Sequence, residues 1–106
     1  MGVSDHIHFP KFIQFSFSIM KLNRKKEIRE MFGAHLKKHR EEHLRIDSMR
    51  QLSFLSNLDH SKLSKIEKGK INLTFDTLME IAITYKLKPK DLFNFPIEFW
   101  EKEADR

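Results

Sequence analysis

The chain lacks cysteine and long hydrophobic runs. None of its 106 residues is a cysteine, which excludes disulfide bonds and thiolate metal sites and fits a reducing cytoplasm. No stretch approaches the roughly eighteen consecutive apolar residues of a membrane-spanning helix. A secretory signal is not evident, because Asp5 lies near the start and Gln14 interrupts the apolar residues around it. The sequence therefore predicts a cytoplasmic protein with no membrane partner.

The chain is basic, but its charge is unevenly distributed. The formal net charge is +5 and the sequence pI is about 9.6, a balance that favours polyanionic partners. Residues 20–46 carry nine Lys or Arg against four acids, whereas residues 94–106 carry two against four. A basic body with an acidic tail is expected of a nucleic-acid-binding protein, although many small basic proteins share it.

The central stretch is SMRQLSFLSNLDHSKLSKIEKGK, residues 48–70. It predicts two short helices joined by a tight turn. Ser48 and Gln51 have the spacing of a capping box at the start of the first helix. Asn57 is expected to end that helix in the left-handed conformation, and Asp59 is expected to cap the second.

The second predicted helix separates its residues by face. Leu63 and Ile66 are three residues apart and point together into the core. The opposite stripe consists only of polar residues, without an acid: His60, Ser61, Ser64, Lys65 and Lys68. Such a stripe suits the major groove of DNA. The alternative is an outer face that meets only water.

The segment from Ser48 to Phe93 resembles the helix-turn-helix DNA-binding domain of the phage repressor and Cro family. The match runs without a gap through LSFLSNLDHSKLSKIEKGKINLTFDTLMEIAITYKL, and residues 63–70 are close to the family signature S-x-I-E-x-G-K. Residues 56–59 and 72–74 are similar to controller proteins of restriction–modification systems, which are small homodimeric regulators. Three residues replace the usual Gln, Ala and Gly of the family: Met49, Ser53 and Asn57.

The resemblance implies an all-α fold, a compact five-helix repressor-like DNA-binding domain with a central helix-turn-helix. The pattern of the sequence agrees. A stripe of Ile28, Phe32 and Leu36 predicts a helix over residues 23–43, and a second apolar stripe predicts a helix over 75–86, capped by Thr74. Pro89 opens a last short helix. We place the helix-turn-helix domain at residues 20–93.

Arg40 and Glu67 are expected to form a structural ion pair. In related domains an Arg late in the first helix pairs with the Glu of the signature, and these residues match those positions. Glu67 also follows Ile66 on the flank of the inward face, where an acid needs a partner.

The resemblance and the chemistry of the stripe together assign the DNA-binding candidates. Candidates for reading bases lie on the second helix of the motif: His60, Ser61, Lys62, Ser64, Lys65 and Lys68. Candidates for phosphate contacts lie on the first helix and in the loop after the second: Arg50, Gln51, Lys70, Asn72 and Thr74.

The first nineteen residues differ from the rest. Phe15, Phe17 and Ile19 alternate with serines, a pattern of period two that predicts an extended, strand-like arm. One interpretation is an arm that covers a dimer; the other is a non-native extension upstream of a start at Met20. The tail at 94–106 is aromatic and then acidic, and it is either a lid or a dimer contact.

Three histidines, His35, His39 and His43, are four residues apart, and residues 39–43 match H-x-x-E-H, a pattern of some zinc peptidases. Such a pattern arises easily by chance in a helix rich in His and Glu, and no third ligand is placed. We therefore predict no metal and no cofactor. No nucleophile–base constellation or phosphate loop is evident either, so we do not expect an enzyme.

The sequence thus predicts a transcriptional regulator that binds double-stranded DNA sequence-specifically as a homodimer on a palindromic operator. The alternative is an antitoxin-type or other protein-interaction module. Such a module would bind a protein partner through the aromatic arm or tail, with or without DNA.

Overall fold

The computed structural model describes residues 11–97, and the side chains of residues 23–97. Its helices are α1 (Lys11–Glu42), α2 (Met49–Ser53), α3 (His60–Glu67) and α4 (Phe75–Tyr85), followed by the 3-10 turn η2 (Pro89–Asp91). Residues 11–97 contain no strand, which confirms the all-α class. The expected five helices are four α-helices and one 3-10 turn.

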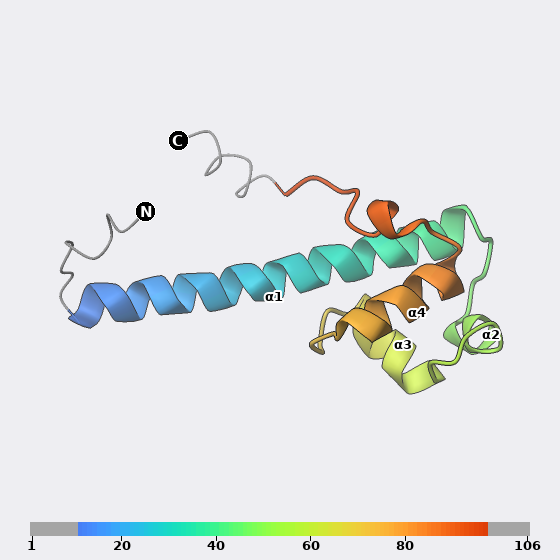
Figure 1. Ribbon diagram of the computed structural model, residues 1–106, viewed down its shortest axis with the longest axis horizontal. Coiled ribbons are helices and arrows are strands. Elements are labelled where there is room, and N and C mark those ends of the chain that lie inside the picture. The colour runs from blue at the N-terminus through green and yellow to red at the C-terminus, as the bar shows by residue number, and fades with distance from the viewer. Residues whose placement is uncertain (1–10, 98–106) are drawn as a thin grey trace.

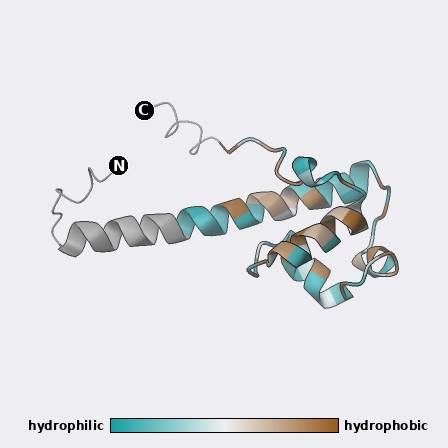
Figure 2. Cartoon of the chain, viewed as in Figure 1, coloured by the Kyte–Doolittle hydropathy of each residue, from teal (hydrophilic) through white to brown (hydrophobic). Residues whose placement is uncertain are grey.

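Helix α1 is the longest element, and α3 and α4 pack against it (Figure 1). Its C-terminal half contacts α3 and α4, while α2 packs on α3. The buried core draws on all four helices and the segment after η2: Phe32, Leu36, Leu52, Leu63, Ile66, Ile81, Ala82, Tyr85 and Leu92. Figure 2 shows hydrophobic residues concentrated in α4 and mixed with polar ones in α3. The core therefore fixes α3 by one face only.

The expected strand at the start of the chain is wrong for residues 11–19. Helix α1 begins at Lys11 and crosses Met20 without a break, so it starts twelve residues before the expected Asn23. Extending an existing helix adds a backbone hydrogen bond for each residue fixed, whereas a lone strand has no partner for its hydrogen bonds. Residues 1–10 of the expected arm and residues 98–106 of the tail lie outside the described residues.

The turn between α2 and α3 also differs from expectation. Helix α2 ends at Ser53, with Phe54 as a right-handed C-cap. The residues with left-handed φ in the described part are Arg45, Gly69 and Lys86, so the expected left-handed stop at Asn57 is wrong. The side chain of Asn57 instead donates to Glu80 Oε1 at 3.3 Å.

Two of the three histidines on α1, His35 and His39, hydrogen-bond to backbone carbonyls in the C-terminal part of the fold. His39 Nε2 lies 2.9 Å from the carbonyl oxygen of Tyr85, and His35 Nε2 lies 2.9 Å from that of Asp91. Because a carbonyl only accepts, both Nε2 atoms must carry the proton and donate. Burial, with the nearby His43 and His35, lowers the pKa of His39 below 6.5 despite its hydrogen bond to Tyr85.

This lowered pKa predicts a loss of stability in acid. The unfolded chain binds a proton at residue 39 more readily than the folded chain, so the folded state is penalised as pH falls below the ordinary histidine value. Between about pH 7 and pH 5, the free energy of unfolding should fall more steeply in the natural chain than in His39→Gln. Urea denaturation at several pH values measures both slopes. Parallel slopes would show that His39 titrates normally.

Candidate nucleic-acid interface

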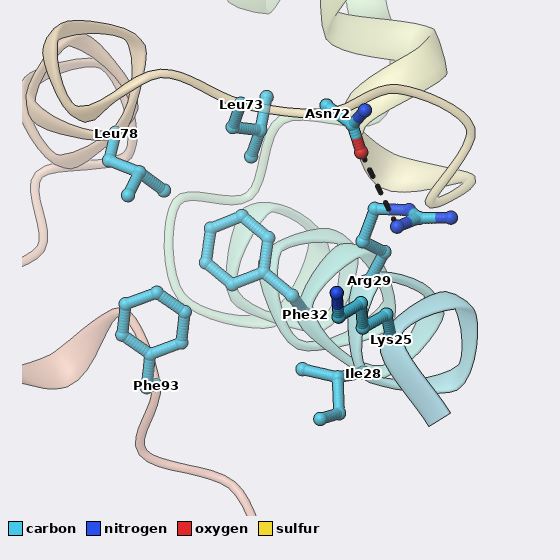
Figure 3. Close-up of a pocket in the computed structure, with 8 residues that line it drawn as sticks. All are labelled: Lys25, Ile28, Arg29, Phe32, Asn72, Leu73, Leu78 and Phe93. Carbon is cyan, nitrogen blue, oxygen red and sulfur yellow. Dashed lines mark hydrogen bonds between the residues drawn. The ribbon is translucent and has the colours of Figure 1, made fainter. Parts of the chain in front are cut away.

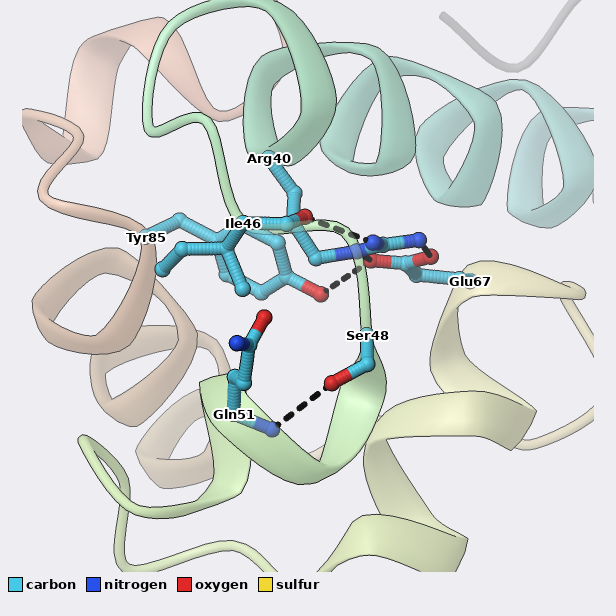
Figure 4. A network of polar contacts seen from close by, with 6 residues as sticks. All are labelled: Arg40, Ile46, Ser48, Gln51, Glu67 and Tyr85. Atoms are coloured by element: carbon cyan, nitrogen blue, oxygen red, sulfur yellow. Dashed lines mark hydrogen bonds and ion pairs between the residues drawn. The ribbon is translucent and has the colours of Figure 1, made fainter.

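Two N-caps define the start of α2 and the start of α3. Ser48 Oγ accepts the backbone N–H of Gln51 at 3.1 Å, while the amide of Gln51 points away from Ser48 (Figure 4). Asp59 Oδ1 accepts the backbone N–H of Lys62 at 2.7 Å. Each cap satisfies one of the backbone donors that a helix start leaves free. The sequence predicted both capping residues correctly. The reciprocal bond of the expected capping box, from the backbone N–H of Ser48 to the side chain of Gln51, is not formed among the described residues.

Helix α3 turns its polar stripe outward. Leu63 and Ile66 are buried on its inner face. Of the base-reading candidates, four are exposed and two are half-buried: His60, Ser61, Lys65 and Lys68, then Lys62 and Ser64. Lys68 follows the last helical residue as the C-cap, so it stands at the end of the stripe.

A shallow concavity lies on this outer side of α3. Its volume is about 290 Å³, and it is lined by Asp59, Ser61, Lys62, Lys65 and Ile71. The side chains of Ser61 and Lys65 thus share one surface with the loop that follows α3. This surface offers a hydroxyl and two ammonium groups as donors beside the carboxylate of Asp59, which caps α3. The donors suit base edges and phosphate oxygens.

All five phosphate candidates are exposed and flank α3: Arg50, Gln51, Lys70, Asn72 and Thr74. They are not equally free. Asn72 Oδ1 lies 3.4 Å from Arg29 Nη1, which ties the loop to α1. The hydroxyl of Thr74 caps α4 by accepting the backbone N–H of Thr77 at 3.1 Å, and Asp76 adds an acid in the same turn. Lys70 is therefore the best-suited phosphate contact in this loop.

A buried polar network fixes the end of α3. Arg40 donates to Glu67 through Nε at 2.8 Å and Nη2 at 2.9 Å, and through Nη1 to the carbonyl of Ile46 at 2.9 Å (Figure 4). The hydroxyl of Tyr85 donates to Glu67 Oε2 at 2.7 Å. This network joins α1, α3, α4 and the loop before α2. The carboxylate of Glu67 thus links the end of α3 to α1 and α4.

The surroundings of the network fix its protonation states. The hydrogen bonds that Arg40 donates to Glu67 raise the pKa of Arg40, and burial raises the pKa of Tyr85 well above its ordinary value. The phenol therefore stays protonated and available as a donor. The bond from Tyr85 to Glu67 was not predicted from the sequence, although a buried Tyr hydroxyl usually has a partner.

Gly33 was also missed, and it sets the distance between α1 and α3. A Cβ atom built there would overlap the carbonyl oxygen of Glu67 and lie 2.7 Å from that of Ile66. At Gly69, which has φ +69°, an added Cβ atom would lie 2.6 Å from the backbone nitrogen of Glu30 in α1. The only signal in the sequence was a glycine inside a predicted helix, where glycine is unfavourable without a packing reason.

The histidines of α1 do not gather with other side chains into a metal site within the described residues. In the described part of the chain, no three His, Asp or Glu side chains gather in a way that could hold a metal ion. The rings of His39 and His43 are stacked with centroids 5.1 Å apart. No helix in that part has the length and apolar character needed to cross a membrane.

Comparison with known proteins adds one family. The model of the Cro/C1-type HTH DNA-binding domain matches residues 35–98, which is more than half of the chain. Comparisons with curated proteins and with solved structures gave no match. The matched range contains α2, α3, their connecting turn and α4. The chain therefore belongs to the Cro/C1-type helix-turn-helix family, and it is a DNA-binding regulator.

Proposed function

We propose that this protein is a sequence-specific transcriptional regulator that places α3 in the major groove of a palindromic operator, as a homodimer. The observation that carries the proposal is the outer stripe of α3. Its hydroxyl and ammonium groups are accessible, and its backbone is held by caps at one end and by the Arg40–Glu67 network at the other. A rigid helix with free donors is what base reading requires.

The candidate contacts divide by chemistry. His60, Ser61, Ser64 and Lys65 are the readers, because they project from the body of α3. Lys62 and Lys68 can serve either bases or backbone. Arg50, Gln51, Lys70, Asn72 and Thr74 position the duplex through phosphates, with Lys70 foremost. Phosphate contacts fix orientation and carry no direct sequence information.

The homodimer is part of the proposal because one recognition helix contacts too few base pairs to select a genomic site. Apolar side chains suited to a subunit interface lie away from the stripe of α3. Phe54 is 80% exposed and Ile83 is 69% exposed. Hydrogen bonds from Thr84 to Ser56 and from Asn57 to Glu80 hold the segment after α2 against α4. We propose that a second copy of the chain covers this surface.

The alternative is an antitoxin-type module that binds a different protein, and the same exposed side chains favour it. Sedimentation of the pure protein distinguishes the two. A dimer that Ile83→Glu dissociates supports the subunit interface. If the protein is a monomer at all concentrations, the exposed surface with Phe54 and Ile83 is not a subunit interface, and binding of another protein is favoured.

Substitutions on α3 test the reading role. Lys65→Ala and Ser61→Ala should each change the preferred bases within the half-site, because a good base contact contributes roughly 1–3 kcal/mol of discrimination. Selection of bound sites from random duplexes measures the preference of each variant. Lys88→Ala removes an exposed lysine far from α3 in sequence, before η2, and serves as the control.

The two variants and the control have distinct expected outcomes. Lys88→Ala should select the same sites as the natural chain. If neither Lys65→Ala nor Ser61→Ala changes the selected sites, α3 does not read the bases.

A further inference from the structure

An apolar groove of about 430 Å³ lies between α1 and the loop before α4 (Figure 3). Its volume is that of a typical ligand or peptide pocket. Figure 3 shows its apolar side chains around one open space: Ile28, Phe32, Leu73, Leu78 and Phe93. The ring of Phe93 is exposed and stacks on Phe32, with centroids 5.2 Å apart. This groove was not predicted from the sequence.

Two cations stand at one side of the groove, and one of them has an unused donor. Lys25 is exposed, and Arg29 reaches Asn72 through a long bond of 3.4 Å. Arg29 Nε is buried and has no hydrogen-bond partner among the residues that the structure describes. A buried donor without an acceptor is unfavourable, and a guanidinium binds a carboxylate through two parallel hydrogen bonds. The groove thus suits an apolar group that carries a carboxylate.

We propose that the chain's own C-terminal segment, residues 98–106, occupies this groove. That segment reads EFWEKEADR. Its adjacent aromatic residues, Phe99 and Trp100, match the apolar walls. Glu98 and Glu101 flank the aromatic pair and match the two cations. Aromatic side chains bury about 150–250 Å² each, so covering this pair would contribute strongly to docking.

The residues between the last described contact on α1 and Trp100 are numerous enough to reach the groove. After η2 the chain lies along α1, where the ring of Phe95 is 5.3 Å from that of His35. Asn94, Phe95 and Pro96 share a second hollow with Met31 of α1. Ile28 lies about 10 Å from His35 along the helix. Five extended residues, from Phe95 to Trp100, span up to about 17 Å. The tether also gives the tail a local concentration on the order of millimolar.

Docking of the tail has a consequence that rests on the proposed function. Asn72 lines the groove and flanks α3. Carboxylates held beside it repel DNA phosphates across the same surface. The docked tail therefore opposes DNA binding.

Trp100 is the only tryptophan, so its fluorescence reports docking without DNA. In the full chain its emission should be blue-shifted and protected from acrylamide quenching, relative to a free peptide of residues 97–106. Lys25→Glu and Ile28→Gln should both move the emission toward that of the peptide. Lys37→Glu makes the same charge reversal at an exposed site on α1, roughly 18 Å further along the helix, and should leave it unchanged.

Three results would overturn the proposal. Emission equal to that of the free peptide in the natural chain would leave the groove to another occupant. A blue shift that both groove variants retain would place Trp100 elsewhere. A shift that disappears on dilution would make the occupant the tail of a second copy. Helical circular dichroism of each variant confirms that it is folded.

DNA binding is measured separately. The double variant Glu98→Gln, Glu101→Gln should bind DNA more tightly than the natural chain at low salt, and the difference should shrink at high salt. Unchanged affinity would refute the coupling between tail and DNA while leaving the fluorescence result intact. Failure of every chain to bind DNA would refute the proposed function instead.

Discussion

Replacing Glu67 with alanine is expected to lower the free energy of unfolding by roughly 3–5 kcal/mol. The side chains of Arg40 and Glu67 are only 5% and 7% exposed. Removing the carboxylate leaves a buried guanidinium without its two charged bonds, and it leaves the Tyr85 hydroxyl without its acceptor. Chemical denaturation at neutral pH measures the loss.

A double-mutant cycle separates the pair from its surroundings. Arg40→Met should cost about as much as Glu67→Ala, and the double variant should recover part of the loss because no unpaired charge remains. Tyr85→Phe is the milder control: it removes one hydrogen bond to a charged group, worth roughly 1.5–3 kcal/mol. Losses below about 1 kcal/mol throughout would mean that the pair behaves like exposed surface charges.

Gly33→Ala is expected to destabilise the fold by about 3 kcal/mol, the upper end of the usual cost of overpacking. The added methyl group meets the backbone of the last turn of α3, and neither carbonyl can move without shifting the helix. The usual effect has the opposite sign, because alanine inside a helix is favoured over glycine by about 1 kcal/mol. Denaturation in urea decides between the two signs.

Ala34→Gly provides the matched control at the neighbouring, exposed position of α1. It should cost about 1 kcal/mol through helix propensity alone. A stabilised Gly33→Ala variant would show that α1 and α3 are not in close contact at this point. Because the added methyl group displaces the end of α3 at Glu67, Gly33→Ala should also bind DNA more weakly than the natural chain, even without denaturant, where the variant is still folded.

The sequence was most informative where local chemistry decides the structure. Capping residues such as Asp59 act within one turn of a helix, so their role is visible from spacing. The inward positions of Leu63 and Ile66 follow from helical periodicity in the same way. For these residues the local pattern and the global fold agree, and the prediction of two short capped helices was confirmed.

The features that escaped prediction depend on partners distant in sequence. The need for glycine at position 33 comes from the backbone of Glu67, which leaves no room for a Cβ atom. The groove forms only when the chain after α4 brings the ring of Phe93 against that of Phe32. The start of α1 escaped for a different reason. A short apolar run with serines at alternate positions fits a strand or a helix, and the extension of an adjacent helix then decides.

We propose that two copies of the chain read a palindromic site through α3. In the palindrome, half-site centres should lie about one helical turn apart, roughly 34–36 Å. A dimer whose cations neutralise on the order of four to eight phosphates gives log affinity against log salt a slope of roughly −4 to −7. Lys70→Ala should make the slope shallower by about two per dimer and leave base preference unchanged.

Binding titrations at several salt concentrations, on a palindromic duplex and on a single half-site, measure whether two copies bind together. The protein should bind the palindrome much more tightly than the half-site, with the steep salt dependence given above. Equal affinity for the two duplexes, or a slope near zero, would contradict binding as a dimer through α3.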